Sequence, residues 1–305
     1  MSPPPAFLPF PDSKYNLPLM DFDTNLLFCW IPKNACTQIK ALFMRKQIGY
    51  RGTAGNNRRD YNYIHKRGFK QVRRYRRKDE YIWSDSSWHK WAIIREPIER
   101  FLSAWLNKCG PSGETDGTKN PRCYHCGSDL GCFIQENHQN LVQASSGGNF
   151  TKIATWDHFL PQYWHCNFKE HFSSYRIFRY STGPSFRSNL RSAFMQINWS
   201  RDIILDSWGP YHHQQFLDGQ TTNQNNRSQF QHYLQLLKKD IDLTDQLIRT
   251  FLIDYLSFSF LLPSWIGEQC MKLTDEQQQK FYVCQLYQEM PHLFEGPASE
   301  KPTIS

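Results

Sequence analysis

Lysine, threonine and arginine side chains, which bind phosphate and sulfate, lie where two short apolar runs change into helical patterns. The first group belongs to the segment PKNACT, residues 32–37, which contains Lys33 and Thr37. The first N–H groups of a helix have no partner within the helix, and the helix dipole adds positive charge there, so such an end binds anions. Lys33 adds a full charge and Thr37 a hydroxyl group. The segment therefore predicts an anion-binding turn.

Arg95 occupies the equivalent place after the second apolar run. It follows Trp91–Ile94 directly, and ligands of open α/β sheets bind beyond the carboxyl ends of strands. Its planar guanidinium group suits phosphate through two parallel hydrogen bonds. Ser103, two helical turns further on, is expected toward the same crevice. Arg100 is expected to pair on the surface with Glu96, four residues earlier.

The segment 32–37 does not match the phosphate-binding loop of nucleotide kinases and NTPases. The sequence GxxxxGK[ST] is absent, and no glycine lies between Leu26 and Ile48. Cys36, inside the turn, is interpreted as a small packed residue rather than a nucleophile.

Two strand-to-helix units must position these residues. The apolar run Leu26–Ile31 predicts a buried strand, and apolar residues at helical spacing from Gln38 predict a helix. The run Trp91–Ile94 predicts a second strand, and Pro97 suits the first turn of the helix after it. Repeated strand-to-helix units predict an α/β fold with a central parallel sheet flanked by helices.

The length of 305 residues fits one large domain, which we place at residues 21–290. A proline-rich extended lead-in, residues 1–20, precedes it, and a loose tail, residues 291–305, follows it. Residues 107–150, rich in Gly, Ser and Cys, predict a long irregular insertion. Residues 182–227 are polar and predict a flexible loop.

The positive charge is concentrated in one segment. Residues 58–78 contain ten Lys or Arg and one acid, which leaves 26 basic and 27 acidic residues elsewhere in a chain of net charge +8. A basic patch on a near-neutral protein indicates a polyanionic partner. The competing interpretations are a solvated surface and a nucleic-acid-binding segment, because aromatic residues that could stack bases alternate with the arginines.

Four of the nine cysteines lie close together, as Cys109, Cys123, Cys126 and Cys132. Disulfides in an oxidising compartment are the first interpretation, free thiols the second and a zinc site the third, because a second CxxC pair is missing. Three Asn-X-Ser/Thr sequons, beginning at Asn149, Asn198 and Asn226, agree with a lumenal location.

The sequence predicts neither a signal peptide nor a membrane span. Its first twelve residues lack the basic start of a secretory signal. The apolar stretch 251–266 carries Asp254 and Pro263, and it is shorter than the ~20 residues that cross a bilayer.

The segments IPKNACTQIK and IREPIERFLSAW resemble the two cofactor motifs of sulfotransferases that use 3′-phosphoadenosine 5′-phosphosulfate (PAPS). The similarity is greatest to the Golgi carbohydrate sulfotransferases of the chondroitin, dermatan and HNK-1 type. WDHFLPQYWHC, residues 156–166, is similar to the family's HWxPQxxxC block, and LIRTFLIDYLSFSF to its closing helix. Trp105 replaces the family's usual tyrosine, and its membrane anchor is not visible.

The resemblance implies a P-loop-like sulfotransferase fold, PAPS as cosubstrate and no metal. It implies that Arg95 and Ser103 bind the 3′-phosphate. The loop around the 5′-phosphosulfate would be formed by Pro32, Lys33, Asn34, Ala35, Cys36, Thr37 and Gln38.

The implied reaction is transfer of the sulfuryl group to an acceptor hydroxyl. Lys33 would stabilise charge on the leaving oxygen, and His158 or His65 would take the hydroxyl proton, with His89 and Glu96 as further candidates. The implied partner is a glycan, including anionic ones drawn to residues 58–78, and no nucleic acid is expected.

The implied location is the Golgi lumen or membrane, with the cytoplasm as alternative. The alternative functions are nucleic-acid binding through residues 58–78 and a catalytically inactive scaffold of the same fold. The sequence indicates neither the acceptor nor the oligomeric state.

Overall fold

The computed structural model describes residues 18–50, 63–64, 81–111, 123–149, 151, 153, 155–181, 184–200 and 226–294. The chain divides into two compact units. The sheet unit comprises residues 12–95 and 164–225, and the helical unit comprises residues 1–11, 96–163 and 226–305. The single domain predicted for residues 21–290 stays a prediction.

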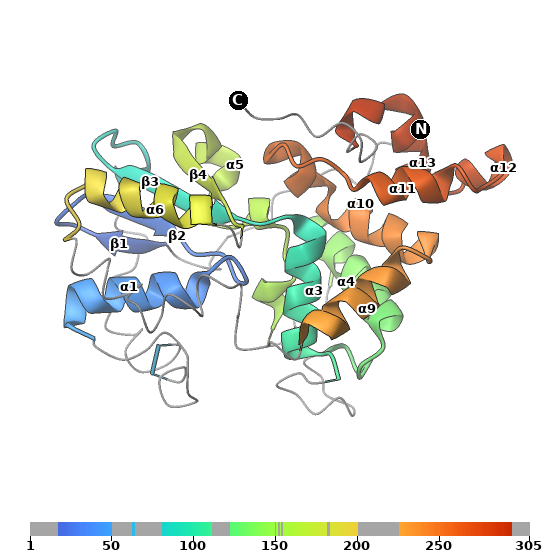
Figure 1. The fold of residues 1–305 in the computed structure, drawn as a ribbon, viewed down its shortest axis with the longest axis horizontal. Coiled ribbons are helices and arrows are strands. Elements are labelled where there is room, and N and C mark those ends of the chain that lie inside the picture. Colours follow the sequence, from blue (N-terminus) through green and yellow to red (C-terminus); the bar gives the residue numbers. More distant parts are fainter. Residues whose placement is uncertain are drawn as a thin grey trace. The chain divides into compact units, whose positions relative to one another are not determined.

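The sheet unit is built on four strands in the order β1-β2-β3-β4 (Figure 1). β2 runs parallel to β3 and β3 parallel to β4, whereas β1 is antiparallel at the edge. The predicted central parallel sheet is therefore confirmed, although β2 ends at Cys29, two residues before the expected end. The strands are β1 (Leu19–Asp21), β2 (Leu26–Cys29), β3 (His89–Ile94) and β4 (Tyr175–Arg179).

One face of this sheet is covered by α1 (Cys36–Ile48) and α6 (Pro184–Gln196). The register places Phe28 opposite Trp91, and Phe194 of α6 packs 6.2 Å from the Phe28 ring and 5.2 Å from the Trp91 ring. Phe43 of α1 lies 6.1 Å from Phe28. The loop predicted for residues 182–227 is thus wrong for residues 184–196, where buried apolar side chains hold a helix against the sheet.

The opposite face packs against residues around Cys166. Tyr175 donates its hydroxyl hydrogen to the Cys166 carbonyl oxygen at 3.0 Å. Its ring lies 4.7 Å from that of Phe168 in the short helix α5 (Phe168–His171). A disulfide joins Cys166 to Cys29 at the end of β2. Helices therefore flank both faces, as predicted.

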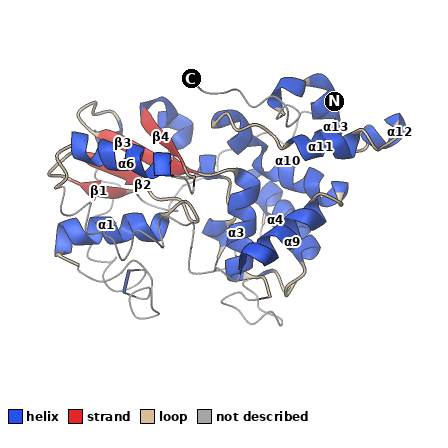
Figure 2. Cartoon of the chain, viewed as in Figure 1, coloured by secondary structure: helices blue, strands red, loops and turns tan. Residues whose placement is uncertain are grey.

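The helical unit contains helices and one isolated bridge among its described residues, and all four strands lie in the other unit (Figure 2). Its α-helices are α3 (Pro97–Lys108), α4 (Leu130–Ser145), α9 (Asn226–Leu237), α10 (Ile241–Ser257), α11 (Ser264–Cys270), α12 (Asp275–Gln278) and α13 (Tyr282–Glu289). The described residues also include the 3-10 helices η5 (Trp156–His158), η6 (Gln162–Trp164), η7 (Phe172–Ser174) and η8 (Pro291–Leu293).

Four phenylalanines from different segments form the core of the helical unit. Phe101 of α3 lies 6.1 Å from Phe133, 5.8 Å from Phe159 and 5.8 Å from Phe251 between ring centres. α3 begins with Pro97, as predicted. The surface position predicted for Arg100 is wrong, because its side chain is fully buried and donates to the Leu160 carbonyl oxygen at 2.8 Å.

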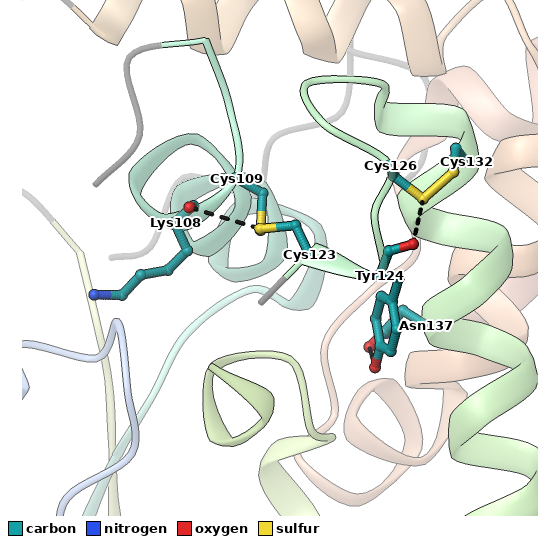
Figure 3. The surroundings of a disulfide bond; sticks show 7 residues. All are labelled: Lys108, Cys109, Cys123, Tyr124, Cys126, Cys132 and Asn137. Atoms are coloured by element: carbon teal, nitrogen blue, oxygen red, sulfur yellow. Dashed lines mark hydrogen bonds between the residues drawn. A yellow bond between two sulfur atoms is a disulfide. The ribbon is translucent and has the colours of Figure 1, made fainter. Parts of the chain in front are cut away.

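The clustered cysteines form two disulfides, Cys109–Cys123 and Cys126–Cys132 (Figure 3). The favoured disulfide interpretation is confirmed, and the zinc and free-thiol alternatives are wrong for these four residues. The irregular conformation predicted for residues 107–150 is wrong over α4, whose first turn is capped by the Asp129 carboxylate, 3.0 Å from the Cys132 N. A further disulfide joins Cys270 to Cys284.

Within the described residues, none of the helices combines the length and the apolar character needed to span a membrane. In the same residues, no group of three or more His, Cys, Asp or Glu side chains could hold a metal ion.

Candidate functional site

The turn between β2 and α1 has an uncommon backbone conformation. Lys33 has φ 70° and Ala35 has φ 58°, so two of three consecutive residues are left-handed without being glycine. Each such residue costs about 1–2 kcal/mol relative to the ordinary helical conformation. Non-glycine residues persist in this region only where their surroundings enforce it, and such positions cluster at functional sites.

Asn34 links this turn to the neighbouring strand β3. Its side chain is 2% exposed, and its Nδ2 donates to the Ile93 carbonyl oxygen of β3 at 2.8 Å. Its backbone N–H donates to the Ile31 carbonyl oxygen at 3.2 Å. The disulfide at Cys29 fixes the strand that leads into the turn. The turn is therefore held between β2 and β3.

The start of α1 carries no internal cap. Its N-cap residue, Ala35, has no side-chain acceptor, and the first turn contains no acidic residue. The helix begins at Cys36, two residues before the predicted start, so Cys36, Thr37 and Gln38 all lie in its first turn. All three are half-buried. An uncapped helix start beside left-handed residues is an arrangement that binds anions.

Arg95 lies beyond the end of the neighbouring strand. Because β2 and β3 are parallel and Cys29 pairs with Ala92, their carboxyl ends lie at one edge of the sheet. The bond from Asn34 to Ile93 joins the turn to β3 two residues before Arg95. The half-buried Arg95 places its guanidinium carbon 5.1 Å from the centre of the Tyr180 ring. The structure thus brings residues 32–38 and Arg95 to one edge.

α3, which follows Arg95, starts differently from α1. The Glu96 side chain is its N-cap, and Oε2 accepts the Glu99 N–H at 2.6 Å while Oε1 accepts the Tyr255 hydroxyl. Burial of this carboxyl raises its pKa to about 6, against the opposing effect of the Tyr255 hydrogen bond. Glu96 therefore serves the start of its own helix.

The other predicted site residues have separate places. Ser103 is half-buried on α3, and His158 is half-buried at the end of η5, with Nδ1 2.8 Å from the Asp157 Oδ1. Both belong to the helical unit. His89 is the first residue of β3, at the opposite end of the strand from Arg95. His65 and most of residues 58–78 lie outside the described residues.

Two of the motif-like segments pair within the helical unit. The Asp254 carboxylate, from LIRTFLIDYLSFSF, accepts the Gln162 N–H at 2.8 Å and the Tyr163 N–H at 2.9 Å, both from WDHFLPQYWHC. Asp254 is fully buried, and burial raises its pKa to about 6 despite these bonds. The sequence could not reveal this pairing, because the partners are 92 and 91 residues apart.

The sequence of this chain is similar to those of known proteins. The sequence model of the family described as "Sulfotransferase family" matches residues 19–261. The chain is 26% identical over 195 residues to the carbohydrate sulfotransferase chst-1 of Caenorhabditis elegans, which covers 61% of this chain and 58% of that protein. It is 30% identical over 92 residues to the protein called putative sulfotransferase vep-2, from the same organism. This alignment covers 30% of this chain and 28% of that protein.

The matched parts are thus less than two thirds of these relatives. No solved structure matches the chain significantly. The family match extends from β1 to the segment after α10 and includes residues 32–38 and Arg95. The chain belongs to the sulfotransferase family.

Proposed function

We propose that this protein is an enzyme that transfers the sulfuryl group of PAPS to a hydroxyl group of a carbohydrate. The observation that carries the proposal is the left-handed, uncapped turn before α1, fixed by Asn34 to the strand that ends beside Arg95. This edge offers an anion-binding backbone and a guanidinium group in one unit of a chain whose family transfers sulfuryl groups.

PAPS requires two separate anion sites, because it carries a 5′-phosphosulfate and a 3′-phosphate on one nucleoside. The residues present fit this demand. Lys33 and the amide groups of residues 35–38 would hold the 5′ end, where α1 has no acidic residue in its first turn to repel it. Arg95 would hold the 3′-phosphate, with the Ser103 hydroxyl as a second proposed contact. We propose no metal.

The chemical step needs charge stabilisation and orientation. PAPS supplies the activated sulfuryl group when it is bound. Lys33 and the first amides of α1 would stabilise the negative charge that develops on the departing phosphate oxygen. An acceptor hydroxyl would be held in line with that bond, and positioning of two reactants lowers the barrier further.

His158 is the proposed base, with His65 as the second candidate. The His158 Nδ1 lies 2.8 Å from the Asp157 carboxylate. If Nδ1 carries the hydrogen and donates it to Asp157, Nε2 is the ring nitrogen whose lone pair can accept the proton of the hydroxyl group. The Asp157 carboxylate would stabilise the charged ring that results.

A carbohydrate acceptor is supported by the similarity to the carbohydrate sulfotransferase chst-1 and by the ten basic residues in 58–78. Four disulfides support an oxidising compartment, which we propose to be the Golgi lumen, with the cytoplasm as alternative.

Asn149 and Thr151 of one sequon are exposed, so we propose N-glycosylation at Asn149. An Asn149→Gln variant made in secreting cells should lose one glycosidase-sensitive mass increment.

The test of this function is transfer of labelled sulfate from PAPS to a panel of glycans, phenols and tyrosyl peptides. We expect label on glycans, loss of transfer in Lys33→Ala, and no change in the control Lys280→Ala, whose side chain is 66% exposed. Label on phenols or peptides alone would overturn the carbohydrate assignment. Nucleotide binding without transfer would favour the inactive scaffold, and polynucleotide binding without nucleotide binding would favour the nucleic-acid alternative.

A further inference from the structure

Tyr180 is a neighbour of Arg95 that sequence reasoning did not identify. β3 and β4 are parallel, and their last residues, Ile94 and Arg179, are paired. The next residues, Arg95 and Tyr180, therefore leave adjacent strands at the same edge of the sheet. The Tyr180 N–H donates to the Ile94 carbonyl oxygen at 2.6 Å, so the pairing fixes the Tyr180 backbone.

The Tyr180 ring supports the Arg95 side chain. The guanidinium carbon lies 5.1 Å from the ring centre, within the range of a cation–π contact. A guanidinium group over a ring keeps N–H donors for hydrogen bonds to an anion.

The Tyr180 ring is itself held in place. Phe186, in the first turn of α6, meets it edge-on with ring centres 5.4 Å apart and an interplanar angle of 65°. Phe186 is 6% exposed and belongs to the core under the sheet. The contact chain from the core through Phe186 and Tyr180 to Arg95 limits the orientations that the guanidinium group samples.

We propose that Tyr180 is a positioning residue that holds Arg95 ready for the 3′-phosphate of the nucleotide. This inference rests on the proposed function, because it assigns Arg95 a phosphate ligand. A flexible arginine side chain loses many conformations when it binds an anion. This loss of conformational entropy makes binding weaker. Stacking on a fixed ring removes those conformations before the ligand arrives.

The expected effect depends on the ring rather than on the hydroxyl group. Tyr180→Leu should raise the Kd for adenosine 3′,5′-bisphosphate by about three- to tenfold, the range of a partly shielded cation–π contact. Tyr180→Phe keeps the ring and should stay within about twofold of the wild type. Tyr81→Leu is the matched control, because Tyr81 is an exposed tyrosine of the same unit.

A double-mutant cycle with Arg95→Ala separates positioning from a general structural role. If Tyr180 acts through Arg95, Tyr180→Leu should change the Kd by less than about twofold in the Arg95→Ala background. It should also leave binding of adenosine 5′-phosphosulfate, which lacks the 3′-phosphate, unchanged.

These binding measurements test the role of Tyr180 separately from the proposed function. Additive effects of Tyr180→Leu and Arg95→Ala, or equal losses for both nucleotides, would overturn the positioning role while the proposed function stands. A wild-type protein that binds adenosine 3′,5′-bisphosphate, with unchanged affinity in Tyr180→Leu, would overturn it as well. A wild-type protein that does not bind the bisphosphate would overturn the function and the inference together.

Discussion

The starts of α1 and α3 follow strands that end at the same edge of one sheet, yet they are built in opposite ways. The chain enters α1 through left-handed Lys33 and Ala35, with no capping side chain and no acid in the first turn. It enters α3 through Glu96, whose carboxylate caps the helix from within, followed by Pro97 and the acidic Glu99. The first start has no acidic side chain of its own, and the second is capped by one.

If the protein binds the proposed nucleotide, we expect different groups to bind its two ends. At α1 the backbone amides and Lys33 would act together, so we expect binding there to be shared among several donors. At α3 the helix start is occupied by its own carboxylate, so we expect recognition of the second phosphate to depend on the Arg95 side chain. The segments β2–α1 and β3–α3 have similar sequence patterns, but the first turns of their helices are capped differently.

The largest expected effect is on the chemical step in Lys33→Ala. Removal of one group that stabilises a developing charge typically lowers kcat by about 100- to 1,000-fold. Initial rates of sulfate transfer at saturating PAPS would measure it, with Lys280→Ala as control. A rate within about threefold of the wild type would mean that the loop amides suffice without this lysine.

Arg95→Ala should weaken nucleotide binding selectively. A lost hydrogen bond to a charged group is worth about 1.5–3 kcal/mol, so the Kd for adenosine 3′,5′-bisphosphate should rise by about 10- to 100-fold. Adenosine 5′-phosphosulfate should bind nearly as before. Calorimetric titration with both ligands would measure the two dissociation constants. An equal loss of affinity for both ligands would contradict the assignment of the 3′-phosphate to Arg95.

Asn34→Ala should loosen the first turn. The Ile93 carbonyl oxygen would lose a buried donor, which lowers the free energy of unfolding by about 1–3 kcal/mol. Urea unfolding would measure it against Asn189→Ala, an exposed asparagine on α6 whose replacement should change stability by less than about 0.5 kcal/mol. Equal stability of the two variants would show that Asn34 does not hold the turn.

Glu96→Gln tests the internal cap of α3 through its pH dependence. Burial raises the pKa of Glu96 from 4.5 to about 6, so the folded state holds this proton more tightly than the unfolded chain. The stabilisation is complete below pH 4.5 and is lost as the pH rises through about 6.

The unfolding free energy of the wild type should therefore fall, relative to Glu96→Gln, by about 1–2 kcal/mol between those pH values. Asp254, which titrates in the same range, is present in both proteins and cancels. Unfolding measured from pH 4 to pH 7 would reveal the difference, whereas parallel curves would contradict burial of the Glu96 carboxyl.

The sequence predicted those features that depend on neighbouring residues. The apolar run at 91–94 and Pro97 located β3 and the start of α3, because strand burial and helix entry leave local patterns. The left-handed conformation of Lys33 and Ala35 could not be predicted from the sequence, because glycine is the residue that usually indicates it and neither residue is glycine. Long-range partners such as Cys29 and Cys166, 137 residues apart, required the folded chain.

The helices α4 and α6 were missed for a related reason. Their sequences are rich in Asn, Gln and Ser, which suggested loops, and apolar side chains on one face of each were outweighed by that composition. Arg100 was predicted to pair on the surface with Glu96, four residues earlier, but the Leu160 carbonyl oxygen provides it with a buried partner. In each case packing against a distant segment overrode the local preference.

The most direct test of the account is a titration of the purified protein with adenosine 3′,5′-bisphosphate and with adenosine 5′-monophosphate. Two anion sites at one sheet edge predict that the bisphosphate binds at least about tenfold more tightly, and that Arg95→Ala abolishes this advantage. Equal affinity for the two nucleotides, or an advantage that survives in Arg95→Ala, would contradict the assignment of the second site.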